Sequence, residues 1–82
     1  MTIYGASWCG ACRAAASYLK ARNIAFEEKD VEKNREAYAE MQRKAAAAGV
    51  RPGALPLIDF RGHLLSGFSP EAINNLIERG NR

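Results

Sequence analysis

Two cysteines three residues apart, Cys9 and Cys12, lie between a short apolar run and a run with helical periodicity. This position constrains what the chain can fold into more than any other feature. In a cytosolic chain with a strand–helix–strand pattern, such a pair is typical of a dithiol redox site. The spacing allows the two thiols to close a disulfide ring, and the start of a helix favours ionisation of the first thiol.

Other roles for the cysteine pair fit less well. A structural disulfide between residues so close in sequence removes little entropy from the unfolded chain. A zinc site usually has four ligands, and the only further histidine or cysteine is His63, far along the chain. Metal or cluster binding through oligomerisation, or a redox-silent pair, remains as an alternative. We expect no metal site within the chain itself.

Length and composition indicate one small domain over residues 1–82, with 48% hydrophobic and 26% charged residues. No apolar run approaches the roughly 18 residues of a membrane span, and the N-terminus lacks the pattern of a signal peptide. The net charge is +3, with basic residues spread rather than clustered, which does not favour nucleic-acid binding. We therefore expect a cytoplasmic monomer with no membrane or nucleic-acid partner.

Several basic side chains are expected to form solvated helix and loop surface, where they could steer an acidic partner. These are Lys20, Arg22, Lys29, Lys33, Arg35, Arg43 and Lys44.

The apolar pattern predicts the element order β-α-β-α-β-β-α. The expected strands cover residues 1–4, 24–31, 57–60 and 63–66, and the expected helices cover residues 9 or 10 to 22, 32–48 and 70–80. A strand, a helix and a strand within about 30 residues favour a right-handed parallel crossover. We expect a mixed sheet with helices on both faces, its first two strands parallel and the later hairpin antiparallel to them.

The helix ends carry recognisable signals. Asn23 is a candidate left-handed terminator, Asn34 a candidate N-cap, and Gly49 a candidate C-terminal stop. Ser69 and Pro70 fit the N-cap and first position of the last helix. The inward stripe of the middle helix is predicted to contain Ala37, Tyr38, Met41, Ala45 and Ala48.

The two cysteines are expected to have different roles. Cys9 lies where the unpaired N–H groups and the positive dipole end of a helix would lower its pKa. Cys12 lies one turn deeper and should be less exposed. Cys9 would then attack a substrate disulfide, and Cys12 would resolve the mixed disulfide. Arg13 either adds positive potential or is a solvated side chain, and Trp8 either anchors the loop or contacts a partner at an exposed rim.

Four features together resemble a glutaredoxin over essentially the whole chain. They are Ile3-Tyr4, the Cys-x-x-Cys pair that opens a helix, Pro56 before a hairpin, and Gly67 before a capped helix. The resemblance implies an α/β, thioredoxin-like fold with a four-stranded mixed sheet flanked by three helices. It also implies that Pro56 is cis, although sequence alone favours trans, and that the backbone of Leu55 pairs with an extended substrate. Trp8, Gly67 and Phe68 would line the groove, although Gly67-Phe68 also fits a tight turn with a core phenylalanine.

The chain departs from glutathione-using glutaredoxins at the positions that hold glutathione. Those proteins usually carry a lysine three residues before the first cysteine, where this chain has Ala6. They usually have Thr-Val-Pro, where this chain has Ala54-Leu55-Pro56, and a Gly-Gly pair followed by aspartates, where it has residues 66–70. The Ser-Gly-Phe stretch followed by a proline is similar to NrdH-type redoxins, which take electrons from thioredoxin reductase. Cys-x-x-Cys-Arg is also similar to arsenate-reductase-like regulators, but those chains are longer.

The resemblance implies a dithiol–disulfide oxidoreductase that reduces protein or glutathione-mixed disulfides through Cys9-Gly10-Ala11-Cys12. Glutathione or thioredoxin reductase would supply the electrons, and no metal or organic cofactor is required. An alternative comes from glutaredoxins that bridge a [2Fe–2S] cluster between two subunits, as cluster carriers or redox sensors, with the first cysteine of each and two glutathiones. Gly10 does not stiffen the loop as a proline would, so it leaves this alternative open.

Overall fold

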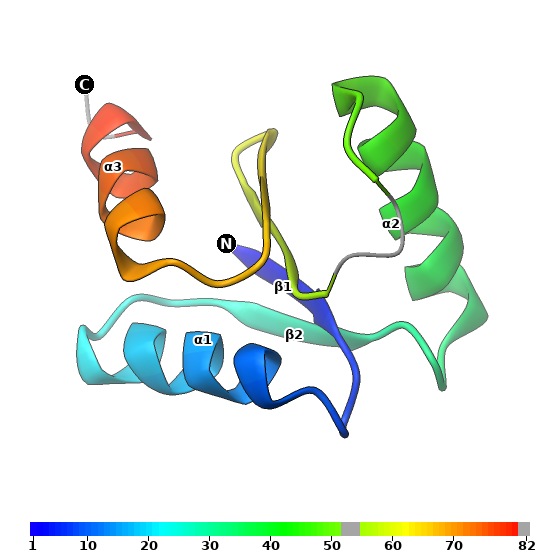
Figure 1. Cartoon of the computed structure of the whole chain (residues 1–82), viewed down its shortest axis with the longest axis horizontal. Coiled ribbons are helices and arrows are strands. Elements are labelled where there is room, and N and C mark those ends of the chain that lie inside the picture. The colour runs from blue at the N-terminus through cyan, green and yellow to red at the C-terminus, as the bar shows by residue number, and fades with distance from the viewer. Residues whose placement is uncertain (52–54, 81–82) are drawn as a thin grey trace.

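The structure is a computed structural model that describes residues 1–51 and 55–80, so Ala54 lies outside the described residues. Four strands and three helices follow one another in the predicted order (Figure 1). Their bounds are β1 Thr2–Gly5, α1 Gly10–Ala21, β2 Glu27–Asp30, α2 Arg35–Ala48, β3 Leu57–Phe60, β4 His63–Ser66 and α3 Pro70–Gly80. The predicted fold class, a four-stranded mixed sheet with three helices, is confirmed.

The strands form one sheet in the order β2-β1-β3-β4. β1 pairs with β2 in parallel and with β3 antiparallel, so that Ile3 lies opposite Glu28 on one side and Ile58 on the other. β3 and β4 form the predicted antiparallel hairpin, which turns through Arg61 and Gly62. The expected strand directions are therefore confirmed.

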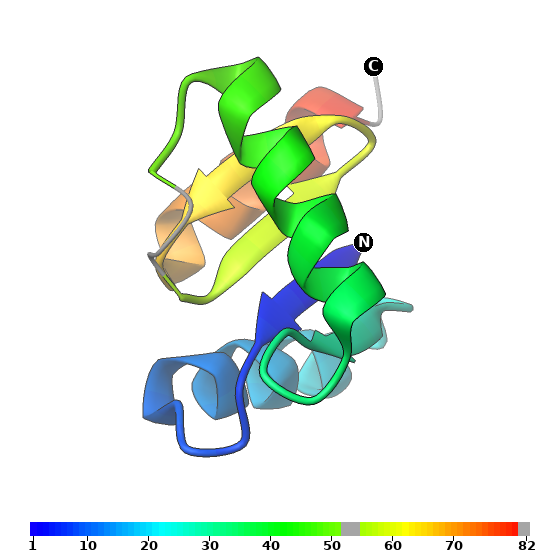
Figure 2. The same ribbon diagram turned by 90° about the vertical axis from the view of Figure 1, so that its right-hand side faces the viewer.

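Helices cover both faces of the sheet, as Figures 1 and 2 show. Ile3 and Ile58 pack with buried residues of α1 and α3 on one face. Tyr4 and Leu57 pack with buried residues of α2 on the other. Successive strand residues point to opposite faces, so two adjacent residues of β1 contribute to two different cores. Among the described helices, none is long and apolar enough to cross a membrane.

The second strand is shorter than predicted, since it covers Glu27–Asp30 rather than residues 24–31. Asn23 has a φ of 58°, and the N–H of Ile24 donates to the carbonyl of Leu19. These residues therefore still belong to the end of α1. Ile24 and Phe26 nevertheless pack against the core, as their apolar side chains suggested.

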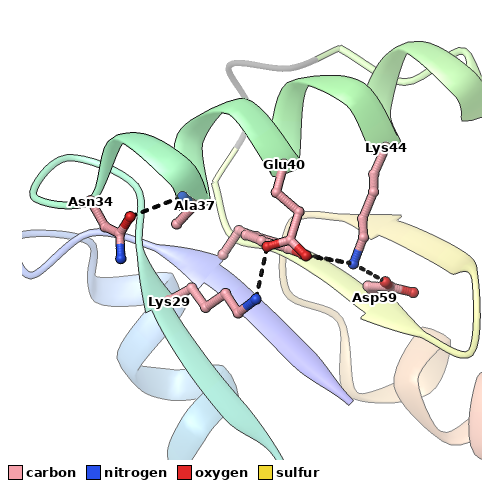
Figure 3. Close-up of polar contacts among 7 residues, drawn as sticks. Lys29, Asn34, Ala37, Glu40, Lys44 and Asp59 are labelled. Atoms are coloured by element: carbon pink, nitrogen blue, oxygen red, sulfur yellow. Dashed lines mark hydrogen bonds and ion pairs between the residues drawn. The ribbon is translucent and has the colours of Figure 1, made fainter.

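The middle helix begins at Arg35 rather than at residue 32. Asn34 caps it, as predicted, because its Oδ1 accepts the N–H of Ala37 at 3.1 Å (Figure 3). The preceding turn is closed by Asp30, whose Oδ1 accepts the N–H groups of Glu32 and Lys33. Gly49 ends the helix with a φ of 71°, a left-handed conformation that glycine adopts without strain.

Two residues predicted on the inward stripe of α2 are exposed. Tyr38 is 46% exposed and its hydroxyl accepts a hydrogen bond from Gln42, and Ala48 is also exposed. The buried residues of α2 are Ala37, Met41 and Ala45. These three are spaced by four residues, which keeps them on one narrow face of a helix with 3.6 residues per turn. Tyr38 lies just outside this face, about 100° from Ala37 and about 60° from Met41 around the helix axis.

The sequence suggested that Lys29 and Lys44 are solvated surface residues. Both instead form ion pairs that tie α2 to the sheet (Figure 3). Lys44 Nζ lies 2.5 Å from Asp59 Oδ2 on β3 and donates to the hydroxyl of Tyr4 at 2.6 Å. Lys29 Nζ on β2 lies 2.8 Å from Glu40 Oε2. The other basic residues of that predicted surface set are exposed.

The pKa values of the four groups in these ion pairs shift in the directions that favour the charged forms: the lysine values are raised and the carboxyl values are lowered. The hydrogen bond from Lys29 lowers the pKa of Glu40 and raises that of Lys29. Burial alone would raise the pKa of Asp59, but hydrogen bonds from Lys44 and the Gly62 N–H outweigh it and lower the pKa. Burial would lower the pKa of Lys44, but its bonds to Asp59 and Tyr4 raise it instead. All four groups are therefore charged near neutral pH.

Candidate active site

The cysteine pair lies at the N-terminus of α1, where Cys9 is the N-cap residue. Its backbone is extended, with φ −83° and ψ 108°, and its N–H donates to the carbonyl of Ala6 at 3.1 Å. Cys9 Sγ accepts the N–H of Cys12 at 3.1 Å. A sulfur atom therefore takes the place that a serine or aspartate oxygen usually has at a helix start.

Cys9 and Cys12 form a disulfide, with their Cα atoms 5.2 Å apart. The expected difference in exposure is wrong: Cys9 is 6% exposed and Cys12 is 7% exposed. The bond holds the Cys9 sulfur against the first turn of α1. Ala6 and Leu55 pack against the pair, so both cysteines are covered in the disulfide form.

The surroundings of Cys9 favour a negative charge on its sulfur. The first turn of α1 contains no acidic residue, and the unpaired N–H groups of a helix start carry partial positive charge. The N–H of Cys12 already points at the sulfur. When the disulfide is broken, these groups can stabilise a thiolate at this position.

Leu55 lies beside the disulfide, although it is far from the cysteines in sequence. The Leu55–Pro56 peptide bond is cis, as the family resemblance implied. Leu55 packs against the cysteine cluster, and Pro56 is buried where β3 begins. The N–H of Gly67 donates to the carbonyl of Pro56 at 2.8 Å, which joins the loop after β4 to this segment.

The two aromatic candidates differ in environment. Trp8 is 67% exposed, so it does not anchor the loop in the core, and it lies at the rim next to Cys9. Phe68 is half-buried, packs against the α1–α3 core and meets the Tyr18 ring edge-on at 5.8 Å between centroids. Packing therefore accounts for Phe68, and a contact with substrate stays a prediction.

Gly5, at the end of β1, is a site residue that the sequence reasoning missed. A Cβ atom at this position would lie 2.7 Å from Cys12 Sγ, closer than packed atoms approach. Any side chain here would press on the sulfur. The only sequence signal is the run of small residues Gly5-Ala6-Ser7 before the cysteines.

A sequence profile of known proteins decides the family. The profile of the family described as Glutaredoxin matches residues 1–58, which include both cysteines and the cis proline. The chain belongs to the glutaredoxin family. The NrdH-type resemblance within that family stays a prediction.

Two glutaredoxin-like relatives align with this chain over different lengths. A protein of Clostridium pasteurianum, described as an uncharacterized glutaredoxin-like 8.6 kDa protein in a rubredoxin operon, is 31% identical over 77 residues. That alignment covers 94% of this chain and 96% of the relative. A putative glutaredoxin of Mycobacterium tuberculosis is 49% identical over 37 residues, which is 45% of this chain and 44% of the relative.

Solved structures share the glutaredoxin fold. A crystal structure of a thioredoxin-like protein superposes with a TM-score of 0.73 and 27% identity, covering 92% of this chain and 96% of the other. A glutaredoxin from Archaeoglobus fulgidus superposes with a TM-score of 0.76 and 22% identity, covering 93% and 83%. At 22% identity, the likeness to the Archaeoglobus fulgidus protein concerns the fold alone.

Proposed function

We propose that this glutaredoxin-family protein is a dithiol–disulfide oxidoreductase that reduces protein disulfides or mixed disulfides with glutathione. One observation carries the proposal. Cys9 and Cys12 are joined at the start of α1, with the N–H of Cys12 on Cys9 Sγ. The arrangement supports a pair of sulfurs that alternate between a disulfide and a dithiol, with the charge of the reduced form placed on Cys9.

The reaction takes two exchange steps. The Cys9 thiolate attacks one sulfur of the substrate disulfide, which forms a mixed disulfide and releases the other sulfur as a thiolate. The Cys12 thiol loses its proton to water and attacks Cys9 Sγ. This step forms the Cys9–Cys12 disulfide and releases the second substrate sulfur. Two electrons pass from the protein to the substrate.

The residues around the pair supply a surface for the substrate. The backbone of Leu55, held by the buried Pro56, offers a partner for an extended peptide. Trp8 adds an exposed aromatic side chain beside Cys9, of the kind enriched at binding hot spots. Gly67 borders this surface through its bond to Pro56, and Phe68 follows it.

The electron source is glutathione or thioredoxin reductase, and the chemistry requires no metal or organic cofactor. Ala6, in place of the usual lysine, favours the reductase, as does the Ser-Gly-Phe stretch at residues 66–68. We place this activity in the cytoplasm, where other systems keep thiols reduced, and in a monomer.

Two coupled assays of NADPH consumption test the proposal, one with glutathione and its reductase and one with thioredoxin reductase. Turnover of a disulfide substrate in either assay supports the proposal and identifies the electron source. Cys9→Ser should abolish turnover while the far-ultraviolet circular dichroism stays unchanged. Turnover that persists in Cys9→Ser, or no turnover with either reductant, would contradict the proposal.

A further inference from the structure

Gly5 is the last residue of β1, and the sheet fixes its backbone. It is the register partner of Asp30 on β2, and its carbonyl accepts the N–H of Val31 at 3.0 Å. Its φ lies outside the left-handed region, so alanine could adopt the same backbone conformation. If a side chain is unsuitable at this position, the reason is therefore the atoms that it would meet.

The atoms that a side chain would meet belong to Cys12. A Cβ atom at residue 5 would lie 2.7 Å from Cys12 Sγ and 3.0 Å from Cys12 Cβ. Packed atoms that are not bonded usually lie about 3.5–4.0 Å apart. Among the described residues, no other atom comes within 4 Å of this position. The backbone at the end of β1 therefore packs against Cys12 alone, and only glycine leaves room for that packing.

The disulfide form cannot relieve such a contact by moving the sulfur. The sulfur of Cys9 is bonded to that of Cys12 but lies beyond 4 Å from the Cβ position of residue 5, on the far side of the Cys12 sulfur. A side chain on Gly5 would therefore push the Cys12 sulfur toward Cys9, to which it is already bonded. Cys9 is itself held by the hydrogen bond from its N–H to the carbonyl of Ala6.

The dithiol form is less constrained. When the disulfide is broken, Cys12 can change between the χ1 rotamers that a helix allows. A cavity of about 300 Å³ that is also lined by Arg13 and Glu28 borders Cys12 and leaves room for this rotation. Only the contact with Cys12 Cβ then remains, and a small shift of the backbone relieves it. A side chain at residue 5 therefore opposes the disulfide more than the dithiol.

We propose that Gly5 is a positioning residue for Cys12, which favours the disulfide over the dithiol and speeds the resolving step. This inference rests on the proposed dithiol function. In the resolving step the Cys12 thiol loses its proton to water, its sulfur attacks Cys9 Sγ, and the substrate sulfur leaves as a thiolate with the electron pair of the broken bond. A side chain at residue 5 would keep the Cys12 sulfur from the position that this attack requires.

Redox exchange between two forms of the protein tests the preference for the disulfide. Oxidised Gly5→Ala is mixed with the reduced unmodified protein and a trace of dithiothreitol as mediator. After an acid quench and alkylation, mass spectrometry gives the redox state of each protein. Electrons should pass to the variant with an equilibrium constant of at least about 10, which corresponds to about 1.4 kcal/mol. An equilibrium constant near one would overturn the inference.

Leu64→Ala is the control for a general loss of stability, because Leu64 is half-buried on β4 and packs in the core on the α2 face. In the same exchange with the unmodified protein, its equilibrium constant should stay within about twofold of one. A shift as large as that of Gly5→Ala would contradict a specific role of Gly5.

The resolving step is observed with the aromatic disulfide of thionitrobenzoate and reduced protein in a stopped-flow instrument. Attack by Cys9 releases one coloured thiolate, and attack by Cys12 on the mixed disulfide releases the second. Gly5→Ala should keep the first phase within about twofold and slow the second at least about tenfold. Equal slowing of both phases, or an unchanged second phase, would contradict the proposal.

Urea unfolding of Gly5→Ala in both redox forms covers the case in which the variant folds poorly. Relative to the unmodified protein, the oxidised form should lose more stability than the reduced form. A variant that does not fold even when reduced would contradict the proposal, because rotation of Cys12 should relieve the contact.

The same experiments separate this inference from the proposed function. If the unmodified protein releases both coloured thiolates but exchanges electrons evenly with Gly5→Ala, only the inference about Gly5 fails. If the unmodified protein releases only one coloured thiolate and turns over no disulfide in either NADPH assay, the proposed function fails.

Discussion

At the scale of single residues, the site depends on a few atoms placed by the start of α1. The helix start near Cys9 and the N-cap role of Asn34 were predicted from the sequence, because both follow from residue types at fixed offsets in a local pattern. The cis Pro56 followed only from the family resemblance, since sequence alone favours trans. Gly5 was not predicted, because its contact with Cys12 Sγ depends on how closely β1 approaches α1.

Trp8 provides a test at this scale. Because its side chain is 67% exposed, Trp8→Ala should change the free energy of unfolding by no more than about 0.5 kcal/mol. The same change should raise KM for a protein disulfide roughly 5- to 30-fold, the effect of losing 1–2 kcal/mol of contact. Urea unfolding and steady-state kinetics measure the two effects. A large loss of stability with unchanged KM would show that Trp8 is structural.

At the scale of elements, α2 is held to the sheet by apolar packing and by the charges around Lys44. The packing stripe was predicted in part, since Ala37, Met41 and Ala45 are buried, but Tyr38 is not. A helical pattern in sequence defines a face only to within a residue. The ion pairs to β2 and β3 join residues distant in sequence, so no local pattern revealed them.

Lys44→Met should destabilise the fold by about 1–2 kcal/mol, because it leaves Asp59, whose side chain is 12% exposed, without its cation. This cost is at the lower end of what is usual for a buried group left without its partner, because the Lys44 side chain is 33% exposed and solvent screens the pair. Urea midpoints measure the change. Arg43→Met, at an exposed position of α2, is the matched control and should stay within about 0.5 kcal/mol. Equal effects of the two variants would contradict the assigned role of Lys44.

The same network predicts how stability depends on pH. The pKa values of Glu40 and Asp59 are lowered in the folded state, so the unfolded chain binds more protons below about pH 4. Their contribution is complete above that pH and is lost as the pH falls through the lowered values. Lys29 and Lys44 have raised pKa values, so their contribution is lost only above about pH 10.5.

Urea unfolding between pH 7 and pH 3 measures this dependence. The unmodified protein should lose stability on acidification, and the double variant Glu40→Gln/Asp59→Asn should lose less over the same interval. A variant with the same acid slope as the unmodified protein would show that other carboxylates determine it.

At the scale of the whole molecule, the topology was predictable and the depth of burial was not. The order of elements and the strand directions followed from apolar periodicity and turn residues. The equal burial of Cys9 and Cys12 did not, because it depends on Leu55 folding back over the pair from a distant segment. The cavity beside Cys12 was hidden for the same reason, since its wall combines β1, α1 and β2.

Ile58 lies on the central strand β3 and is fully buried among residues of β1, α1 and α3. Ile58→Ala should cost about 2–5 kcal/mol, a large share of the roughly 5–15 kcal/mol that stabilises a domain. Leu64→Ala, on the half-buried edge strand β4, should cost less. The free energies of unfolding of the two variants are measured by chemical unfolding. Equal losses would contradict the assigned core.

The most direct test of the account is the ionisation of Cys9 in the Cys12→Ser variant, which keeps the backbone N–H that bonds to the sulfur. Thiolate absorbance is followed against pH, with Cys9→Ser as the control in which only Cys12 titrates. We predict a pKa for Cys9 within about 3.5 to 7.5, below the value of about 8.5 for a free cysteine. A pKa at or above about 8.5 would contradict the claim that the start of α1 holds Cys9 as a reactive thiolate.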